Sequence, residues 1–297
     1  MVDTLFIGLS IGSILLLVAL GLTITYGAMG VINMAHGEMV MIGAYVTVLS
    51  GIYLGANLLV AMPLAFLVAG AIGWGIEWLL VRRLYGRLID TLLATWGIAI
   101  LLQQAVRLEL GLSFFGIHID GLGPGLQNVD VPAFLRGTIP MLGTEINAYR
   151  SFIILVTLLL TAMTWFIMYR TSIGMQVRAV MRNRNMAAAC GIDVKRVNAL
   201  TFAYGSALAG VAGVMMAGFK TVFPDMGASM VIDGFMVVVV GGVGSLFGAV
   251  AASGILGEIN GLVAAATNDI LARAVVFGTV IVVIVLMPKG LFSFKGR

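Results

Sequence analysis

Long apolar runs, separated by short polar segments, follow one another along the whole chain. Each run is close to the roughly 20 residues that a helix needs to cross the hydrocarbon core of a bilayer. A further apolar stretch, 231–264, is interrupted by the glycine-rich segment GGVGSLFG at 241–248. The pattern predicts an all-α, polytopic transmembrane bundle with about eight membrane segments, built as a single domain over 1–297. The uninterrupted runs are 4–28, 35–55, 57–81, 91–109, 151–169, 199–219 and 270–287.

Composition supports a membrane protein and argues against a nucleic-acid-binding one. Hydrophobic residues make up 61% of the chain and charged residues only 10%, whereas soluble domains carry about 25% charged residues. The net charge of +4 is no sign of nucleic acid as a partner, because the basic residues gather in loops. Most runs are apolar on every face, so membrane lipid or other helices must surround them. The first run lacks the basic flank of a cleavable signal, and we expect it to be kept as a span.

The basic residues predict how the chain is oriented in the membrane. Twelve of the 17 Lys and Arg residues lie in 82–87, 170–196 and 289–297, so these three segments should be cytoplasmic. The N-terminus and the loop 110–150 are then external. The basic C-terminal tail is cytoplasmic only if 231–264 enters the membrane and returns. We therefore expect a broken or re-entrant segment that folds back at Gly241, Gly242 and Gly244.

Three polar residues, Asn33, His36 and Glu38, stand in an otherwise apolar stretch. On a helix, Asn33, His36 and Gly37 would share one face and Glu38 another. Intramembrane ionisable residues face the protein interior or a water-filled path. Two interpretations stay open: a polar lining or gate of a substrate pathway, or a hydrogen-bonded brace between helices. The brace suits Glu38 better.

The glycine-rich segment at 241–248 is the later of two apolar stretches that glycines interrupt, the earlier being 27–37. Discontinuous helices of transporters have this appearance. We therefore add Gly241, Gly242 and Gly244 to the candidate pathway or gate.

The segment 170–198 predicts a short amphipathic helix, over about 174–190, that is too polar to span a membrane. Thr171 or Ser172 can cap its start, and Gly191 suits the left-handed position at its end. Asp193 would cap a second short turn before the next span. A solvated linker is the plain alternative to a helix that docks in a partner's groove. The docking helix is favoured because its apolar side chains would otherwise face water; it presents Arg178, Arg182 and Arg184 beside Met175, Val180, Met181 and Met186.

The run 199–219 carries small residues at a spacing of four: Gly205, Ala209, Gly213 and Ala217. This spacing places them on one helix face, where another helix can approach closely. We expect that face to be a packing surface.

The sequence lacks the motifs of several kinds of binding and catalytic site. There is no G-x-x-x-x-G-K-[ST] phosphate loop and no Cys and His spacing suited to a metal, since His118 is far from His36. GLSIG at 8–12 matches the hydrolase pattern G-x-S-x-G around Ser10, but inside a span. An intramembrane hydrolase and a stand-alone solute channel are thus distant alternatives, and we expect no catalytic residue and no metal.

Three blocks resemble the permease subunits of ABC importers for branched-chain amino acids and urea. They are GLTITYGAMGVINMAHGEMVMIGAYV (21–46), the segment 174–213, and VVVVGGVGSLFGAVAA (237–252). The resemblance implies a bacterial inner-membrane protein that moves its solute by ATP-driven alternating access. Its partners would be a second homologous permease subunit, two cytoplasmic ATPase subunits and an extracytoplasmic substrate-binding protein. ATP and Mg²⁺ would be used by the ATPases, with no cofactor bound by this chain.

In such permeases the segment that corresponds to 174–191 is the coupling helix that meets the ATPase. The resemblance therefore assigns coupling to Gly174, Arg178, Arg182, Arg184, Met186 and Gly191. The segments 84–107, 128–137 and 290–297 look most like the branch that carries urea or short-chain amides. Branched-chain amino acids are the alternative substrate.

Overall fold

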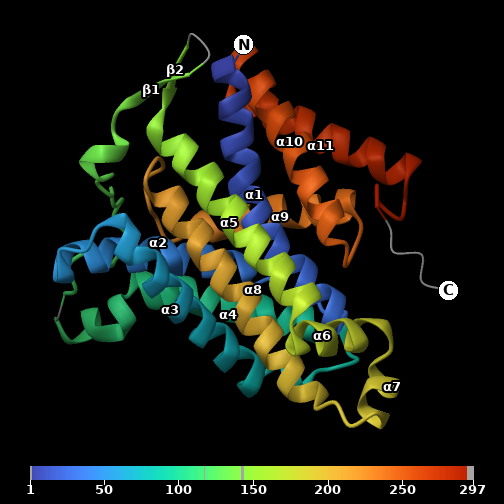
Figure 1. The fold of residues 1–297 in the computed structure, drawn as a ribbon. Coiled ribbons are helices and arrows are strands. Elements are labelled where there is room, and N and C mark those ends of the chain that lie inside the picture. Colours follow the sequence, from blue (N-terminus) through green and yellow to red (C-terminus); the bar gives the residue numbers. More distant parts are fainter. Residues whose placement is uncertain (1, 117, 142–143, 293–297) are drawn as a thin grey trace.

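The computed structural model describes the whole chain except residues 1, 117, 142–143 and 293–297. Eleven α-helices appear in the described part, together with short 3₁₀ helices and one two-stranded hairpin (Figure 1). The first half holds α1 (Val2–Met29), α2 (His36–Leu54), α3 (Leu58–Leu79), η1 (Val81–Arg83), α4 (Leu88–Arg107), η2 (Glu109–Phe115), η3 (Ala133–Leu135), β1 (Thr138–Met141) and β2 (Thr144–Asn147). The second half holds α5 (Ala148–Arg170), α6 (Ser172–Arg182), α7 (Arg184–Ala189), α8 (Val194–Ala217), α9 (Met226–Gly241), α10 (Leu246–Ala266) and α11 (Asp269–Leu286).

Eight helices of the described chain are long and apolar enough to cross a membrane, which confirms the predicted polytopic bundle. α9, with 16 residues, is shorter. The ends of the spans follow local hydrogen bonding. Asn57 and Asn268, for example, cap α3 and α11 by accepting from the backbone N–H groups of Val60 and Leu271. The apolar runs thus set which segments become helices, and caps set where they begin.

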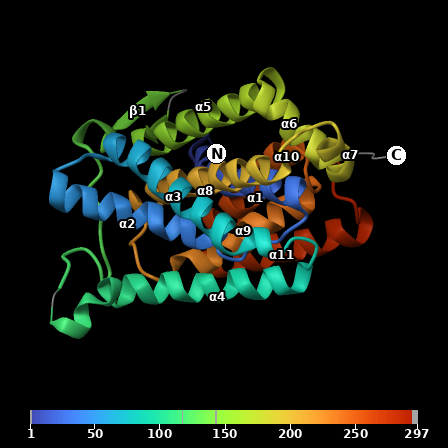
Figure 2. The ribbon, with the colours of Figure 1, turned by 90° about the horizontal axis from the view of Figure 1, so that it is seen from below.

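α8 lies at the centre of the bundle, with α1 and α2 beside it (Figure 2). These three helices bury two thirds or more of their apolar windows, whereas α4, α5 and α11 bury less than a quarter. The outer helices present exposed apolar side chains such as Leu101, Phe166 and Val285. Such surfaces are stable only against lipid or another membrane subunit.

The small-residue face of α8 lies against α1 and α2. A Cβ on Gly205 would meet the backbone of Gly21 on α1, and one on Gly213 would meet the carbonyl oxygen of Val40 on α2. Ala209 and Ala217 are buried beside them. α8 therefore fixes the positions of α1 and α2 through direct backbone approach.

A second small-residue contact joins α1 to α10. Gly8 and Gly12 of α1 face Gly257 and Gly261 of α10 so closely that a Cβ on any of the four would strike the partner helix. The two glycines of the GLSIG motif therefore serve helix packing. Ser10 donates to the carbonyl oxygen of Ile7 and accepts from Arg150, and neither partner is a general base for a hydrolase.

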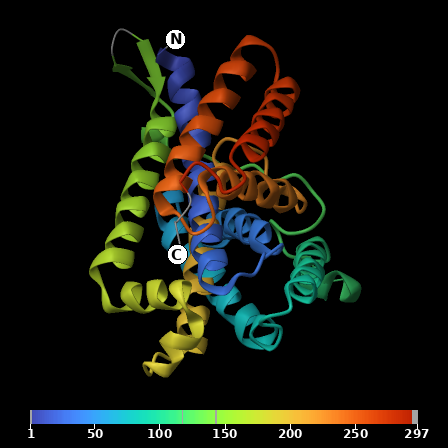
Figure 3. The same cartoon turned by 90° about the vertical axis from the view of Figure 1, so that its right-hand side faces the viewer.

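The reversal predicted within 231–264 is confirmed. α9 ends at Gly241, α10 begins at Leu246, and the turn between them uses positive φ at Gly242 (97°) and Gly244 (77°). The end of the described tail lies on this turn, since the N–H groups of Leu291 and Phe292 donate to the carbonyl oxygens of Val240 and Gly241. α10 then runs back along α1 toward the N-terminus (Figure 3).

We distinguish two ends of the molecule by the elements that they carry. The hairpin end carries β1, β2 and the N-terminus, and the coupling end carries α6 and α7 (Figure 1). Met181 of α6 contacts the positions of Gly27 and Gly244, so the α9–α10 turn and the described tail also lie at the coupling end. Lys295, in the basic tail predicted to be cytoplasmic, falls outside the described residues.

Three local predictions were wrong. Asn33 is not on a helical face with His36, because α1 ends at Met29 and the next residue, Gly30, has φ of 65°. Asn33 then accepts from the Ala35 N–H in a turn. The amphipathic helix predicted over 174–190 is two helices, since Asn183 ends α6 and its side chain caps α7. Asp193 caps the span α8 directly, and no separate short turn intervenes. In all three places an Asn or Asp side chain competes with the backbone for hydrogen bonds.

Candidate functional site

His36 begins α2 deep inside the bundle and is fully buried against α1. Its Nε2 lies 3.1 Å from the carbonyl oxygen of Val18, which can only accept, so Nε2 carries the proton. Its ring also sits where a Cβ on Gly21 would be. The imidazole therefore ties the start of α2 to the middle of α1.

Glu38, two residues further along, ties α2 to α4. Only 1% of the residue is exposed, and its Oε1 accepts from the side-chain amide of Gln103 at 2.9 Å. Its other oxygen lies where a Cβ on Gly227 of α9 would be, and has no hydrogen-bond partner among the described residues. Neither cavity described below is lined by Asn33, His36 or Glu38. Within this subunit the geometry supports the brace, and the pathway role of these residues stays a prediction.

The candidate gate glycines form the tightest part of the α9–α10 turn. A Cβ on Gly241 would meet the backbone of Gly248, and one on Gly242 would meet the backbone of Lys289 and Phe292. Gly244 faces Met181 and Gly27 instead. The structure therefore brings one gate glycine to the coupling segment and keeps all three away from His36.

α6 and α7 form an elbow at the coupling end. Gly174 lets α6 cross the last turn of α5, because its Cα lies against the carbonyl oxygens of Ile167 and Met168. Val177 and Val180 are buried, whereas Met175 and Met186 are about 60% exposed (60% and 62%). One face of the elbow packs on the bundle and its opposite face offers methionines to a partner. Gly191 takes the left-handed conformation expected of it, with φ of 85°.

Arg184 joins this elbow to a buried ion pair that the sequence did not reveal. Its guanidinium stacks 4.4 Å from the ring centre of Tyr85. Tyr85 in turn donates to Glu77, a fully buried residue of α3, which also accepts from Arg82 at 3.1 Å. Burial, and then Glu77, raise the pKa of the Tyr85 phenol, so it stays a donor. The only sequence signal was a Glu near the end of an apolar run, five residues before an Arg.

A cavity of about 400 Å³ opens at the coupling end between the last turns of α1, the end of α5, α6 and the α9–α10 turn. Arg178 and Arg182 line it together with Gly244. It is the one place where predicted coupling residues and a predicted gate residue share a surface among the described residues.

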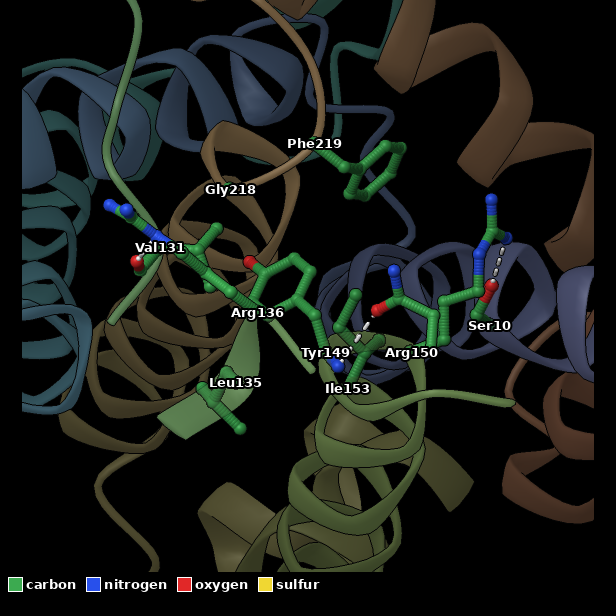
Figure 4. A pocket seen from close by; sticks show the side chains of 10 residues that line it. Ser10, Val131, Leu135, Arg136, Tyr149, Arg150, Ile153, Gly218 and Phe219 are labelled. Carbon is green, nitrogen blue, oxygen red and sulfur yellow. Dashed lines mark hydrogen bonds between the residues drawn. The ribbon is translucent and has the colours of Figure 1, made fainter. Parts of the chain in front are cut away.

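A pocket of about 300 Å³ lies at the hairpin end (Figure 4). Arg136 and Arg150 line opposite sides of it, with Tyr149 between them. Arg136 is engaged by Asp130 and by the carbonyl oxygen of Val131. Arg150 donates only to the hydroxyl of Ser10, at 2.9 Å, and none of the ion pairs formed by described residues includes it. Arg150 therefore has no ion pair among the described residues, and the nearest negative charge that acts on it, on Asp3, lies beyond ion-pair distance.

The loop that follows α4 is fixed by Glu109. Its carboxylate accepts from His118 at 3.1 Å and from the Ile119 N–H at 2.7 Å. These bonds, the His118 contact foremost, lower the pKa of Glu109. The loop is thus ordered by an ionised carboxylate.

Eight apolar spans, a broken helix and an amphipathic elbow at one end define a polytopic membrane protein, the architecture of a permease. The comparison with protein families agrees. Residues 4–285 match the family described as branched-chain amino acid transport system / permease component. The chain belongs to this family, whose members are the membrane components of ABC transporters, with ATP hydrolysis in separate subunits.

Full-length relatives carry the same description. The high-affinity branched-chain amino acid transport system permease protein LivH of Salmonella typhimurium is 35% identical over 97% of this chain and 94% of its own length. BraD of Pseudomonas aeruginosa, with the same description, is 33% identical over 96% and 94%. A permease of that system with another name, LivM of Salmonella typhimurium, is 25% identical over 82% of this chain and 60% of its own. No solved structure gives a significant match.

Proposed function

We propose that this chain is a permease subunit of an ABC importer for branched-chain amino acids. The observation that carries the proposal is the full-length similarity to LivH and BraD, both of which are named for that substrate class. The expectation of urea or short-chain amides finds no support among these relatives. The alternative kept open from the sequence is therefore the better supported one.

The chemistry of the hairpin-end pocket also favours an amino acid over urea. Arg150 has a neutral partner, Ser10, and no carboxylate within ion-pair distance among the described residues. A guanidinium binds a carboxylate through paired, charge-assisted hydrogen bonds. Every amino acid brings a carboxylate, whereas urea is neutral. We infer that Arg150 receives the solute's carboxylate as it arrives from the binding protein.

The two ends suit different partners. The exposed methionines Met175 and Met186 of the elbow fit a groove on a cytoplasmic ATPase, in the manner of a helix docked by its apolar face. The hairpin end would meet the extracytoplasmic binding protein. A second permease, resembling LivM, would cover part of the exposed apolar surface. The chain would then lie in a bacterial inner membrane with its N-terminus outside and its tail in the cytoplasm.

The proposed mechanism is alternating access driven from the coupling end. ATP binding by the partners would move α6, and Met181 would pass that movement to α1 at Gly27 and to the α9–α10 turn at Gly244. α8 would carry it further, because its backbone touches those of α1 and α2. Packed cores shift between discrete arrangements rather than deforming smoothly.

The test is uptake by the complete importer in proteoliposomes, with ATP at the ATPase side and the binding protein at the other. Leucine, isoleucine and valine should enter, while urea and acetamide should not. Arg150→Gln should raise the KM for leucine, and Arg150→Lys should restore it in part. Arg136→Gln is the matched control, because that guanidinium already has partners in the same pocket. Uptake of urea in preference to leucine would overturn the proposal.

The two rival classes are tested in the same vesicles. A stand-alone channel would pass solute in vesicles that contain this chain alone, whereas a permease subunit should not. An intramembrane hydrolase would lose activity with Ser10→Ala. For the importer, the same change removes only one neutral contact of Arg150.

A further inference from the structure

Two polar groups in the coupling-end cavity have no hydrogen-bond partner among the described residues. One is Nη1 of Arg178, a buried atom on a guanidinium that stacks 5.0 Å from the ring centre of Tyr169. The other is the hydroxyl of Thr23, a residue of α1 that is only 1% exposed. Buried polar groups are nearly always satisfied in native proteins. The two unsatisfied groups belong to residues of two helices that line one cavity, and a ligand with hydrogen-bond acceptors in that cavity is the partner they lack.

The cavity is positively charged. Arg178 and Arg182 both line it, no Asp or Glu is among its lining residues, and neither arginine takes part in an ion pair formed by described residues. The ligand that satisfies both the charge and the donors is an anion with several oxygens, such as a phosphate group.

The remaining wall of the cavity is apolar and reaches the outer surface. Ile24, Met168 and Leu246 line the inside, and Val243 and Tyr169, at the margin, are 45% and 43% exposed. Next to this margin lie Trp165 and Phe247, both more than half exposed. Exposed Trp and Tyr at the end of a span mark the level of the lipid headgroups. The cavity thus combines a basic interior with an apolar mouth at that level.

We propose that this cavity binds the phosphate headgroup of an anionic phospholipid from the leaflet at the coupling end. The phosphate oxygens would accept from Arg178 and from the hydroxyl of Thr23, while the acyl chains would lie over Val243 and Phe247. Basic pockets between membrane helices on the cytoplasmic side bind anionic headgroups for the same physical reasons. A soluble phosphate would satisfy the donors but would leave the apolar mouth uncovered.

Such a lipid would also affect the moving parts of the subunit. It would touch α1, α6 and the α9–α10 turn at once, because all three line the cavity. The bound lipid would therefore hold α6 against the α9–α10 turn. Retention of the lipid would restrict the movement of α6, and release of the lipid would permit it.

The experiment uses the assembled importer in nanodiscs made from phosphatidylcholine with or without phosphatidylglycerol. Native mass spectrometry counts retained phosphatidylglycerol, and a thermal melt records the stabilisation it gives. Loss of one basic contact weakens anionic-lipid binding about fivefold, so Arg178→Gln should lower retention by that factor and remove most of the stabilisation. Arg178→Lys should keep part of both. Thr23→Val, which keeps the side-chain shape, should lower retention to a smaller extent and serves if Arg178→Gln does not assemble.

Arg83→Gln is the matched control, because Arg83 is an exposed basic residue at the same end that does not line the cavity. It should retain phosphatidylglycerol as the unsubstituted protein does. Equal retention in Arg178→Gln and Arg83→Gln would overturn the proposal. So would equal stabilisation by soluble glycerol 3-phosphate in phosphatidylcholine alone, which would assign the cavity to a free phosphate. The proposal would also be overturned if the complex retained no phosphatidylglycerol but Arg178→Gln abolished ATP-coupled uptake. That result would indicate that an acidic side chain of the ATPase occupies the cavity.

Discussion

The contact between Gly213 of α8 and Val40 of α2 offers a direct test of the packing at the centre of the bundle. A Cβ added to Gly213 would strike the carbonyl oxygen of Val40, and would lie 2.9 Å from the amide nitrogen of Ala44. Carbon atoms in contact normally sit about 3.5–4.0 Å from their neighbours. All the atoms in the way are backbone atoms of a helix, so α2 and α8 must move apart to admit the methyl group.

The expected magnitude follows from two opposing effects. Overpacking of a well-filled interior costs about 1–3 kcal/mol, while replacing a helical Gly by Ala gains about 0.5–1 kcal/mol in helix propensity. Gly254 of α10 shows the propensity gain alone, because a Cβ there would have nothing within 4 Å. The propensity gain is common to both sites. Gly213→Ala should therefore be less stable than Gly254→Ala by the overpacking cost, about 1–3 kcal/mol.

The assay is reversible unfolding in mixed micelles by titration with sodium dodecyl sulfate, followed by helical circular dichroism. Gly254→Ala should match or exceed the stability of the unsubstituted chain, and Gly213→Ala should fall below it. Indistinguishable unfolding free energies for the two variants would refute the close approach of α2 and α8. Leucine uptake by the assembled importer should fall with Gly213→Ala for the same reason.

Three further predictions concern charged groups. Arg82→Gln should destabilise the subunit by about 3–5 kcal/mol, because it leaves the fully buried carboxylate of Glu77 without its counter-ion. The sodium dodecyl sulfate titration measures this loss of stability. A loss below about 1 kcal/mol, typical of exposed pairs, would contradict the buried ion pair. Glu109 has a lowered pKa, so the order it gives the 109–119 loop should be complete above the ordinary carboxyl pKa and lost as pH falls through the lowered value. His118→Ala should move that loss to higher pH, as read from hydrogen-exchange protection at the Ile119 amide; an unchanged midpoint would exclude the His118 contact as the cause. Arg182→Glu should leave folding and insertion intact but abolish ATP-driven uptake, and normal uptake would remove α6 from the mechanism.

Much of the fold could be predicted because lipid imposes a simple rule. A span must satisfy its own backbone hydrogen bonds and cover them with apolar side chains, so each long apolar run became a helix. The reversal within 231–264 was also predictable from the location of charge, and its position from the glycine-rich segment at 241–248. A basic tail at 289–297 had to share the side of the other basic segments, and only a chain that turns back within 231–264 allows this.

What could not be predicted depends on single side chains that bond to the backbone. Asn183 divides the elbow by capping α7 at a point where the amphipathic pattern continues without interruption. Glu77 gave almost no signal, since its partners Arg82 and Tyr85 lie beyond the end of the span and meet it only through tertiary packing. The candidate pathway residues show the same limit. The pattern identified His36 and Glu38 as unusual, but it could not show that their partners are Val18 and Gln103.

The arrangement at the coupling end explains why one glycine lies in the last turns of α1 and another in the α9–α10 turn. Gly27 and Gly244 come from segments more than 200 residues apart in the chain, yet one side chain, Met181, lies against both. A larger residue at Gly27 would take the place of the Met181 methyl group and separate α6 from α1. At Gly244 a larger residue would be strained by the positive φ of 77°. Methionine suits this position because its long, flexible side chain keeps contact with both segments as their spacing changes. In the proposed mechanism, Gly27 and the α9–α10 turn are therefore the two surfaces through which α6, driven by an ATPase, would act on the bundle. The anionic lipid proposed in the adjoining cavity would oppose that movement.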